Sequence, residues 1–154
     1  MDTGNDRKAI DILRQRLHDS PNDASLLYLL GESLLRSGVP ADSPEYHEAQ
    51  TALENAVRLN PALCLSHVSL GSIYLDEGRY ADAVIELKRA KEIDPTEHSV
   101  YSHLAVAYRR SGNMQAAKDV LNELQERMTR ERQTTRDRMK AQTDQAESQT
   151  SHTP

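Results

Sequence analysis

The sequence predicts an all-α protein whose helices form hairpins stacked in a row. Three observations support this fold class: a short pattern recurs along the chain, apolar residues within each copy are three and four positions apart, and turn-forming residues separate the copies. With 154 residues the chain is long enough for one domain. It contains no Trp and no Phe, so a core must consist mainly of Leu, Ile, Val, Ala and Tyr, a mixture that suits helices better than sheets.

The recurring pattern is an alanine followed four residues later by a leucine and, in three copies, twelve residues later by a proline. The copies begin at Ala9, Ala49, Ala83 and Ala117, so they are 40, 34 and 34 residues apart. Between them recur a small residue (Gly31, Gly71, Ala105) and a glycine (Gly38, Gly78, Gly112), with the same spacings. A period of this length indicates a repeat architecture.

Each recurring residue has a role in a hairpin of two packed helices. The small residue in the first helix allows a second helix to approach closely. The later glycine permits the positive φ with which many helices end. The prolines follow Ser20, Asn60 and Asp94, which we expect to cap the N-termini of the following helices. Asn113 is expected to begin the last helix.

These residues resemble the tetratricopeptide repeat family, whose unit is a 34-residue helix-turn-helix with a Trp, Leu-Gly, Tyr, Ala, Phe and Pro signature. The middle unit fits best, with Leu70, Gly71, Tyr74, Gly78, Tyr80, Ala83, Leu87, Ala90 and Pro95 at the family's positions. Its departures are His67 where Trp is usual and Leu87 where Phe is usual. The third unit has Tyr101 at the Trp position and lacks the closing proline, and the first fits only with six extra residues in its turn.

The resemblance covers residues 6–128 and implies a right-handed α-solenoid of about three hairpins. The expected repeats are residues 24–61, 64–95 and 98–128, preceded by a capping half-unit at 6–20. Residues 129–154 are charged and polar, and we expect a helix to about residue 140 and disorder after 145. The arginines of this extension are interleaved with acidic residues, which favours a solvated helix over an RNA-binding one.

In the family, the first helices of the hairpins line a concave groove that receives a peptide or a partner helix. Carried over by position, the lining is Ser25, Tyr28, Leu29, Glu32, Leu35 and Arg36 in the first unit. It is Leu65, Val68, Ser69, Ser72, Leu75 and Asp76 in the second, and Ser99, Ser102, His103, Val106, Arg109 and Arg110 in the third. The Lys, Asn and Arg with which some members hold a chaperone's C-terminal carboxylate are missing. The apolar middle and the basic end at Arg109 and Arg110 instead predict a peptide with apolar anchors and an acidic residue.

Composition and residue spacing disfavour other functions. Nineteen Lys and Arg against twenty-four Asp and Glu give a net charge of −5, which repels nucleic acid. His67 and the single Cys64 are expected to be buried packing residues, and His98 and His103 lie too far round a helix to form a metal pair. We therefore expect no enzyme activity, cofactor, metal site or membrane span, and a cytoplasmic protein with a protein or peptide partner. The alternatives are a self-associating structural module, and so a homo-oligomer, or a small secretion-type chaperone.

Overall fold

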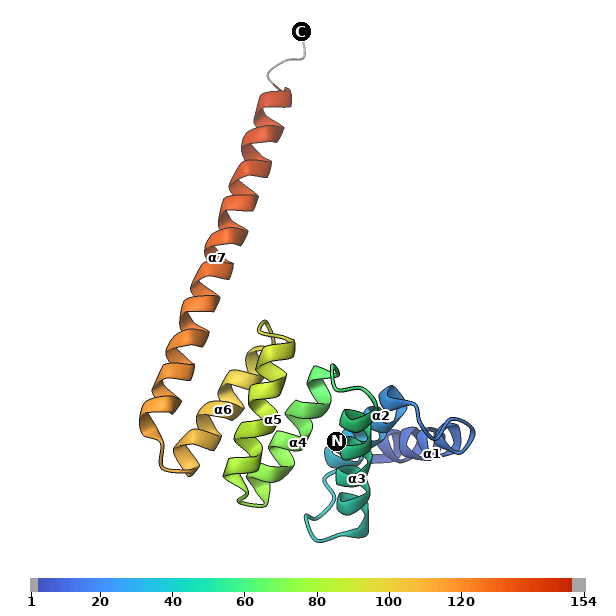
Figure 1. Ribbon diagram of the computed structural model, residues 1–154. Coiled ribbons are helices and arrows are strands. Elements are labelled where there is room, and N and C mark those ends of the chain that lie inside the picture. The colour runs from blue at the N-terminus through green and yellow to red at the C-terminus, as the bar shows by residue number, and fades with distance from the viewer. Residues whose placement is uncertain (1–2, 151–154) are drawn as a thin grey trace.

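The computed structural model describes residues 3–150, with side chains from 6 to 145, and this part of the chain contains seven helices and no strand (Figure 1). The helices are α1 (Thr3–Asp19), α2 (Ala24–Arg36), α3 (Pro44–Leu59), α4 (Cys64–Asp76), α5 (Tyr80–Ile93), α6 (His98–Arg110) and α7 (Met114–Thr150). The predicted all-α fold is therefore confirmed.

The helices form a stack in which neighbours in sequence are neighbours in space. The pairs α2–α3, α4–α5 and α6–α7 pack as hairpins, while α1 packs on α2, α3 on α4 and α5 on α6. The first helices also contact each other, α2 with α4 and α4 with α6. This arrangement is the α-solenoid expected from the repeat, and it places α2, α4 and α6 side by side.

The glycines that close the first helices adopt the predicted conformation. Gly38, Gly78 and Gly112 have φ of +74°, +74° and +84°, a region that residues with a Cβ rarely adopt. Asn113 follows the last of these glycines, and its side chain accepts a hydrogen bond from the Ala116 amide at 3.1 Å. It caps α7 as expected.

The predicted N-caps at the other junctions need correction. Asn60 and Asp94 end α3 and α5, and the next helices begin four residues later, at Cys64 and His98. Ser20 likewise lies four residues before the start of α2 at Ala24, and the N-cap of α2 is Asp23. The side chain of Asn60 accepts a hydrogen bond from the Ala62 amide, and that of Asp94 accepts one from the Thr96 amide. Each of these residues, together with the proline that follows it, therefore forms an Asx-type turn. The residue types that favour this turn also favour an N-cap, which explains the misplacement.

Buried leucines of the second helices form the centres of the stack. Leu53 of α3 is 0% exposed and packs with Leu70 and Ile73 of α4. Leu87 of α5 is equally buried in the cluster that contains Val100 and Leu104 of α6. Each first helix therefore covers the second helix of the preceding hairpin.

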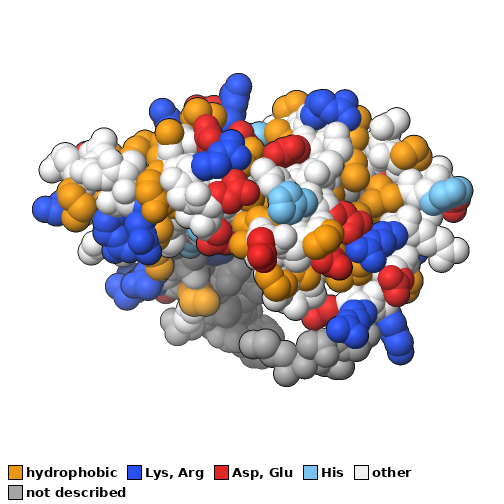
Figure 2. Space-filling view, turned by 90° about the horizontal axis from the view of Figure 1, so that it is seen from below, with side chains coloured by type: hydrophobic (Ala, Val, Ile, Leu, Met, Phe, Trp, Pro, Cys, Tyr) orange, Lys and Arg blue, Asp and Glu red, His pale blue; other side chains and the backbone are white. Residues whose placement is uncertain are grey.

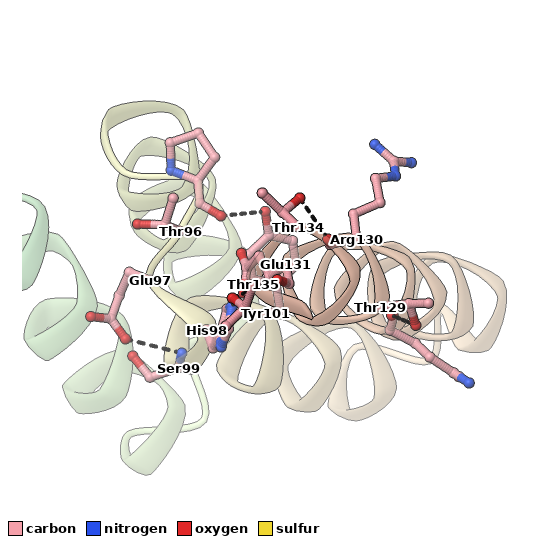
Figure 3. Close-up of polar contacts among 12 residues, drawn as sticks. Thr96, Glu97, His98, Ser99, Tyr101, Thr129, Arg130, Glu131, Thr134 and Thr135 are labelled. Carbon is pink, nitrogen blue, oxygen red and sulfur yellow. Dashed lines mark hydrogen bonds and ion pairs between the residues drawn. The ribbon is translucent and has the colours of Figure 1, made fainter. Parts of the chain in front are cut away.

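The last helix extends well beyond the stack (Figure 1). Its 37 residues correspond to about 55 Å at 1.5 Å per residue. It reaches Thr150, past the expected end near residue 140 and into the region expected to be disordered, and residues 151–154 lie outside the described residues. No Gly or Pro separates Asn113 from Pro154, and pairs four apart such as Arg130–Glu126 support the solvated turns. The side chain of His98 in α6 lies 3.3 Å from Glu131 of this helix (Figure 3).

Candidate functional site: the face of the first helices

The candidate site is the face formed by α2, α4 and α6. A hydrogen bond crosses two of these helices, donated by the Ser69 hydroxyl of α4 to the Glu32 carboxylate of α2 at 2.8 Å. The pKa of Tyr28, one turn before Glu32, is raised chiefly by burial, and then by the negative charges of Glu32 and of Glu97 at the start of α6. Side chains from all three hairpins therefore interact electrostatically across this face.

The predicted groove residues differ in their accessibility. Arg36, Leu65, Ser102, Arg109 and Arg110 are exposed, whereas Tyr28, Glu32, Ser72, Ser99, His103 and Val106 are half-buried. Val68 and Ser69 are buried, each at 8% exposure, so little of either side chain is available to a partner. Val68 belongs to the core cluster that contains Tyr101 and Leu104 of α6, and the Ser69 hydroxyl is used by Glu32. The packing of α6 beside α4 is the reason, because it covers part of the face that a single helix would expose.

Two large apolar side chains remain exposed on this face. Leu29 of α2 is 45% exposed and Leu65 of α4 is 42% exposed. Leu75, predicted to complete the apolar middle, instead packs against the core. The apolar part of the site thus lies nearer the first two hairpins than the sequence indicated.

The charged residues at the two ends of the face have different surroundings. Arg36 of α2 binds Asp6 of α1, with Nη2 3.0 Å from Oδ1, so it ties the first helix to the stack. Arg109 lines a cavity of about 300 Å³ between α6 and α7, whereas its neighbour Arg110 does not line this cavity. Of the two arginines predicted to form one basic end, only Arg109 lines this cavity.

The histidine at the site uses one ring nitrogen within its own helix. Nδ1 of His103 lies 2.8 Å from the carbonyl oxygen of Ser99. A carbonyl only accepts hydrogen bonds, so Nδ1 is the donor in this contact and Nε2 is left to interact with a ligand. The half-buried ring can therefore form a hydrogen bond with a ligand that reaches the third hairpin.

The other candidates for chemistry are packing residues. The Cys64 thiol donates a hydrogen bond to the Ala90 carbonyl at 3.4 Å. Burial raises the pKa of this thiol, and a raised pKa makes a thiol less nucleophilic at neutral pH. Within residues 6–145, no group of three or more His, Cys, Asp or Glu side chains is arranged to hold a metal ion. None of the helices within residues 3–150 combines the length and apolar character that a bilayer span requires.

Comparison with known proteins agrees with the repeat architecture. A family model described as a TPR repeat matches residues 71–112, and a second, described as a tetratricopeptide repeat, matches residues 100–127. The chain contains tetratricopeptide repeats. Both matches lie after the first hairpin, whose turn carries the six additional residues. No curated protein sequence matches the chain.

Solved structures share the tetratricopeptide solenoid. A crystal structure of MamA is 22% identical, with a TM-score of 0.75 over 86% of this chain and 74% of that chain. A second MamA crystal structure has 22% identity and a TM-score of 0.73, with coverages of 86% and 69%. The MamA 41-end structure from Desulfovibrio magneticus RS-1 has 23% identity and a TM-score of 0.69, with coverages of 80% and 66%. Identity at this level shows the fold alone.

The Trp position of the tetratricopeptide unit is used in an unusual way in the second repeat. His67 occupies it with 4% exposure; its Nδ1 lies 2.7 Å from the Glu86 carboxylate and its Nε2 lies 3.0 Å from the Pro61 carbonyl oxygen. Both partners are acceptors, so the two hydrogen bonds form together only when both ring nitrogens carry a proton. The hydrogen bond to Glu86 raises the pKa of His67 against the opposing effect of burial.

Tyr101 occupies the same position in the third repeat. Its hydroxyl donates to the Pro95 carbonyl oxygen at 2.9 Å, the counterpart of the Pro61 carbonyl that His67 binds. The two repeats therefore hold the same turn with different donors. The sequence indicated a buried packing role for His67, and its hydrogen bond to Glu86 could not be foreseen, because Glu86 lies on the other helix of the hairpin.

The free energy of unfolding is expected to fall as the pH rises above neutrality. Because the pKa of His67 is higher in the folded state than its usual value near 6.5, its stabilising contribution is complete below that value and is lost as the pH rises through the folded-state pKa. His67→Tyr should remove this dependence, because tyrosine supplies the hydrogen bond seen at Tyr101. Urea denaturation between about pH 6 and pH 9 measures the effect. His47→Tyr on the exposed face of α3 is the control, and an identical pH profile for wild type and His67→Tyr would contradict the assignment.

Proposed function

We propose that the chain is a protein-interaction scaffold that binds a segment of a partner protein along the face of α2, α4 and α6. The observation that carries this proposal is the exposure of Leu29 and Leu65 on that face, 45% and 42%. The solenoid leaves both side chains exposed, whereas every other leucine except Leu121 is buried or half-buried. Such side chains beside polar ones are typical of a protein-binding surface.

The polar residues of the face indicate the character of the partner. Tyr28 and Glu32 lie beside the apolar part, and the Glu32 carboxylate is held in place by Ser69. At the other end, Arg109 and Arg110 are exposed at the end of α6. A segment with two apolar anchors and an acidic residue toward the arginines matches this distribution. A self-associating module remains the alternative function.

Charge substitution of the two leucines tests the proposal. Leu29→Glu/Leu65→Glu is expected to reduce partner capture by more than about tenfold, because desolvating a carboxylate in an apolar contact is unfavourable. Affinity purification with mass spectrometry identifies candidates, and calorimetry with each purified candidate measures the loss. Arg109→Glu/Arg110→Glu should weaken binding similarly if the acidic residue is present.

A matched control is available on the outer helices. Ile85 of α5 is 60% exposed and lies on a second helix, so Ile85→Glu adds the same charge away from the proposed face. Partners that bind wild type and Leu29→Glu/Leu65→Glu equally well would refute the site. Light scattering over a range of concentrations distinguishes the self-associating alternative, in which the wild type itself would form oligomers.

A further inference from the structure

The groove at the C-terminal end of the stack is open. It lies between α6 and α7, has a volume of about 300 Å³ and is lined by Ala105 and Val106 of α6 and by Ala117 and Leu121 of α7. Met114 also lines it and is 54% exposed. The groove is therefore largely apolar and accessible.

The same groove exists in the two preceding hairpins, where a helix fills it. Leu53, Leu87 and Leu121 occupy one position of the repeat, yet their exposures are 0%, 0% and 47%. In the first hairpin α4 covers the leucine with Leu70 and Ile73. In the second, α6 covers it with Val100 and Leu104. By continuity with these interfaces, the shape of the third groove suits an α-helix.

The described part of this chain provides no helix for the third groove. After Leu121, α7 continues without a break to Thr150 and leads away from the stack (Figure 1). The other end of a second copy is a poor occupant, because Ile10, Leu13 and Leu17 of α1 already pack against its own α2 and α3. Among the described side chains of α1, Ile12 is the one large apolar residue left exposed, at 53%, and a single residue does not form an apolar stripe.

The charge around the groove distinguishes it from the inner ones. Arg109 and Lys118 line it, and no acidic side chain does. The corresponding residues of the second hairpin are Leu75 and Val84, which pack against the core. Figure 2 shows Lys and Arg side chains beside hydrophobic ones at the end of the molecule formed by this hairpin. The third groove keeps the apolar floor of the others and gains a basic rim.

We propose that this terminal groove binds an amphipathic, acidic α-helix of a partner protein. Apolar residues of that helix at three- and four-residue spacing cover Leu121 and Ala105, as α6 covers the preceding groove. Its carboxylates face Arg109 and Lys118 across the rim. The site shares Ser102, Val106 and Arg109 with the third-hairpin end of the face proposed above, but its lining does not include Leu29 or Leu65.

A pair of synthetic helical peptides tests the proposal without a known partner. The first copies residues 97–111, whose apolar residues fill the inner groove, and carries glutamate in place of Ser102, Arg109 and Arg110. The second carries lysine at these places. Alanine-rich helical segments extend both peptides to about 20 residues, because shorter helices are only marginally stable in water. Each is labelled with a fluorophore and titrated with the full chain by fluorescence anisotropy.

The acidic peptide is expected to bind with a Kd of about 100 μM or tighter, and the lysine peptide at least about tenfold more weakly. Leu121→Glu should abolish binding, and Arg109→Glu/Lys118→Glu should reverse the preference between the peptides. Leu65→Glu, outside the groove, should leave binding unchanged, which separates this inference from the proposed function. Circular dichroism verifies that each variant is folded; Leu121 and Lys118 are exposed.

Three results would overturn the inference. The first is no saturable binding of the acidic peptide up to about 1 mM, which corresponds to a binding free energy of only about −4 kcal/mol. The second is equal affinity for the two peptides, or affinity that Leu121→Glu does not change. The third is a wild-type oligomer that Leu121→Glu dissociates in light scattering, since the occupant would then be a second copy of this chain.

Discussion

Leu87→Ala is expected to lower the free energy of unfolding by about 2–5 kcal/mol. The side chain is 0% exposed and packs in the largest buried cluster, with Val100, Tyr101 and Leu104 among its members. Truncation leaves a cavity that the two packed helices close only partly. Urea denaturation monitored by far-UV circular dichroism measures the loss.

The chain supplies a matched control for this substitution. Leu121→Ala makes the same change at the same position of the third repeat, where the side chain is 47% exposed. We expect a loss of less than about 1 kcal/mol there, because little apolar area leaves the protein interior. Equal losses for the two variants would show that Leu121 is covered in solution, which would also contradict an open terminal groove.

Gly71→Ala is expected to destabilise the protein by about 1–3 kcal/mol, although alanine is the better helix former by up to about 1 kcal/mol. A Cβ at this position would lie 2.6 Å from Cγ and 2.8 Å from Cδ2 of Leu87. These contacts are too short, so the two helices of the hairpin would have to move apart. Thermal and urea unfolding of the variant test this expectation.

A double-mutant cycle identifies the cause. In the Leu87→Ala background the atoms that clash with the new Cβ are absent, so Gly71→Ala should there be neutral or stabilising. The third repeat already has alanine at this position, and Ala105→Gly should cost only about the helix-propensity difference, about 1 kcal/mol. If Gly71→Ala destabilised both backgrounds equally, the clash with Leu87 would not be its cause.

The hairpins were predictable from the sequence because their signals are local. Gly38, Gly78 and Gly112 end helices because each must adopt a positive φ, and this requirement depends on neighbouring residues only. The junctions at Asn60 and Asp94 were misplaced by one turn because a short polar side chain before proline favours an N-cap and an Asx-type turn alike. The residue types thus predicted where each turn lies but did not distinguish an N-cap from an Asx-type turn.

The candidate site was only partly predictable, because exposure depends on contacts between hairpins. Five of the residues at groove positions in the repeat differ in exposure: Leu65, Ser102 and Arg109 are exposed, whereas Val68 and Ser69 are covered where α4 meets α6 and α2. The raised pKa of His67 likewise depends on Glu86, nineteen residues away on the neighbouring helix.

Local sequence signals were enough to locate the repeat, the two helices of each unit and the glycines that end the first helices, because helix periodicity and backbone preference act over a few residues. The tertiary structure decided which copies of a repeated residue are covered. Leu53, Leu87 and Leu121 carry the same local signature, yet two are buried and one is half exposed. The physical reason is that the covering helix belongs to the next repeat, and after the third repeat α7 continues away from the stack in its place.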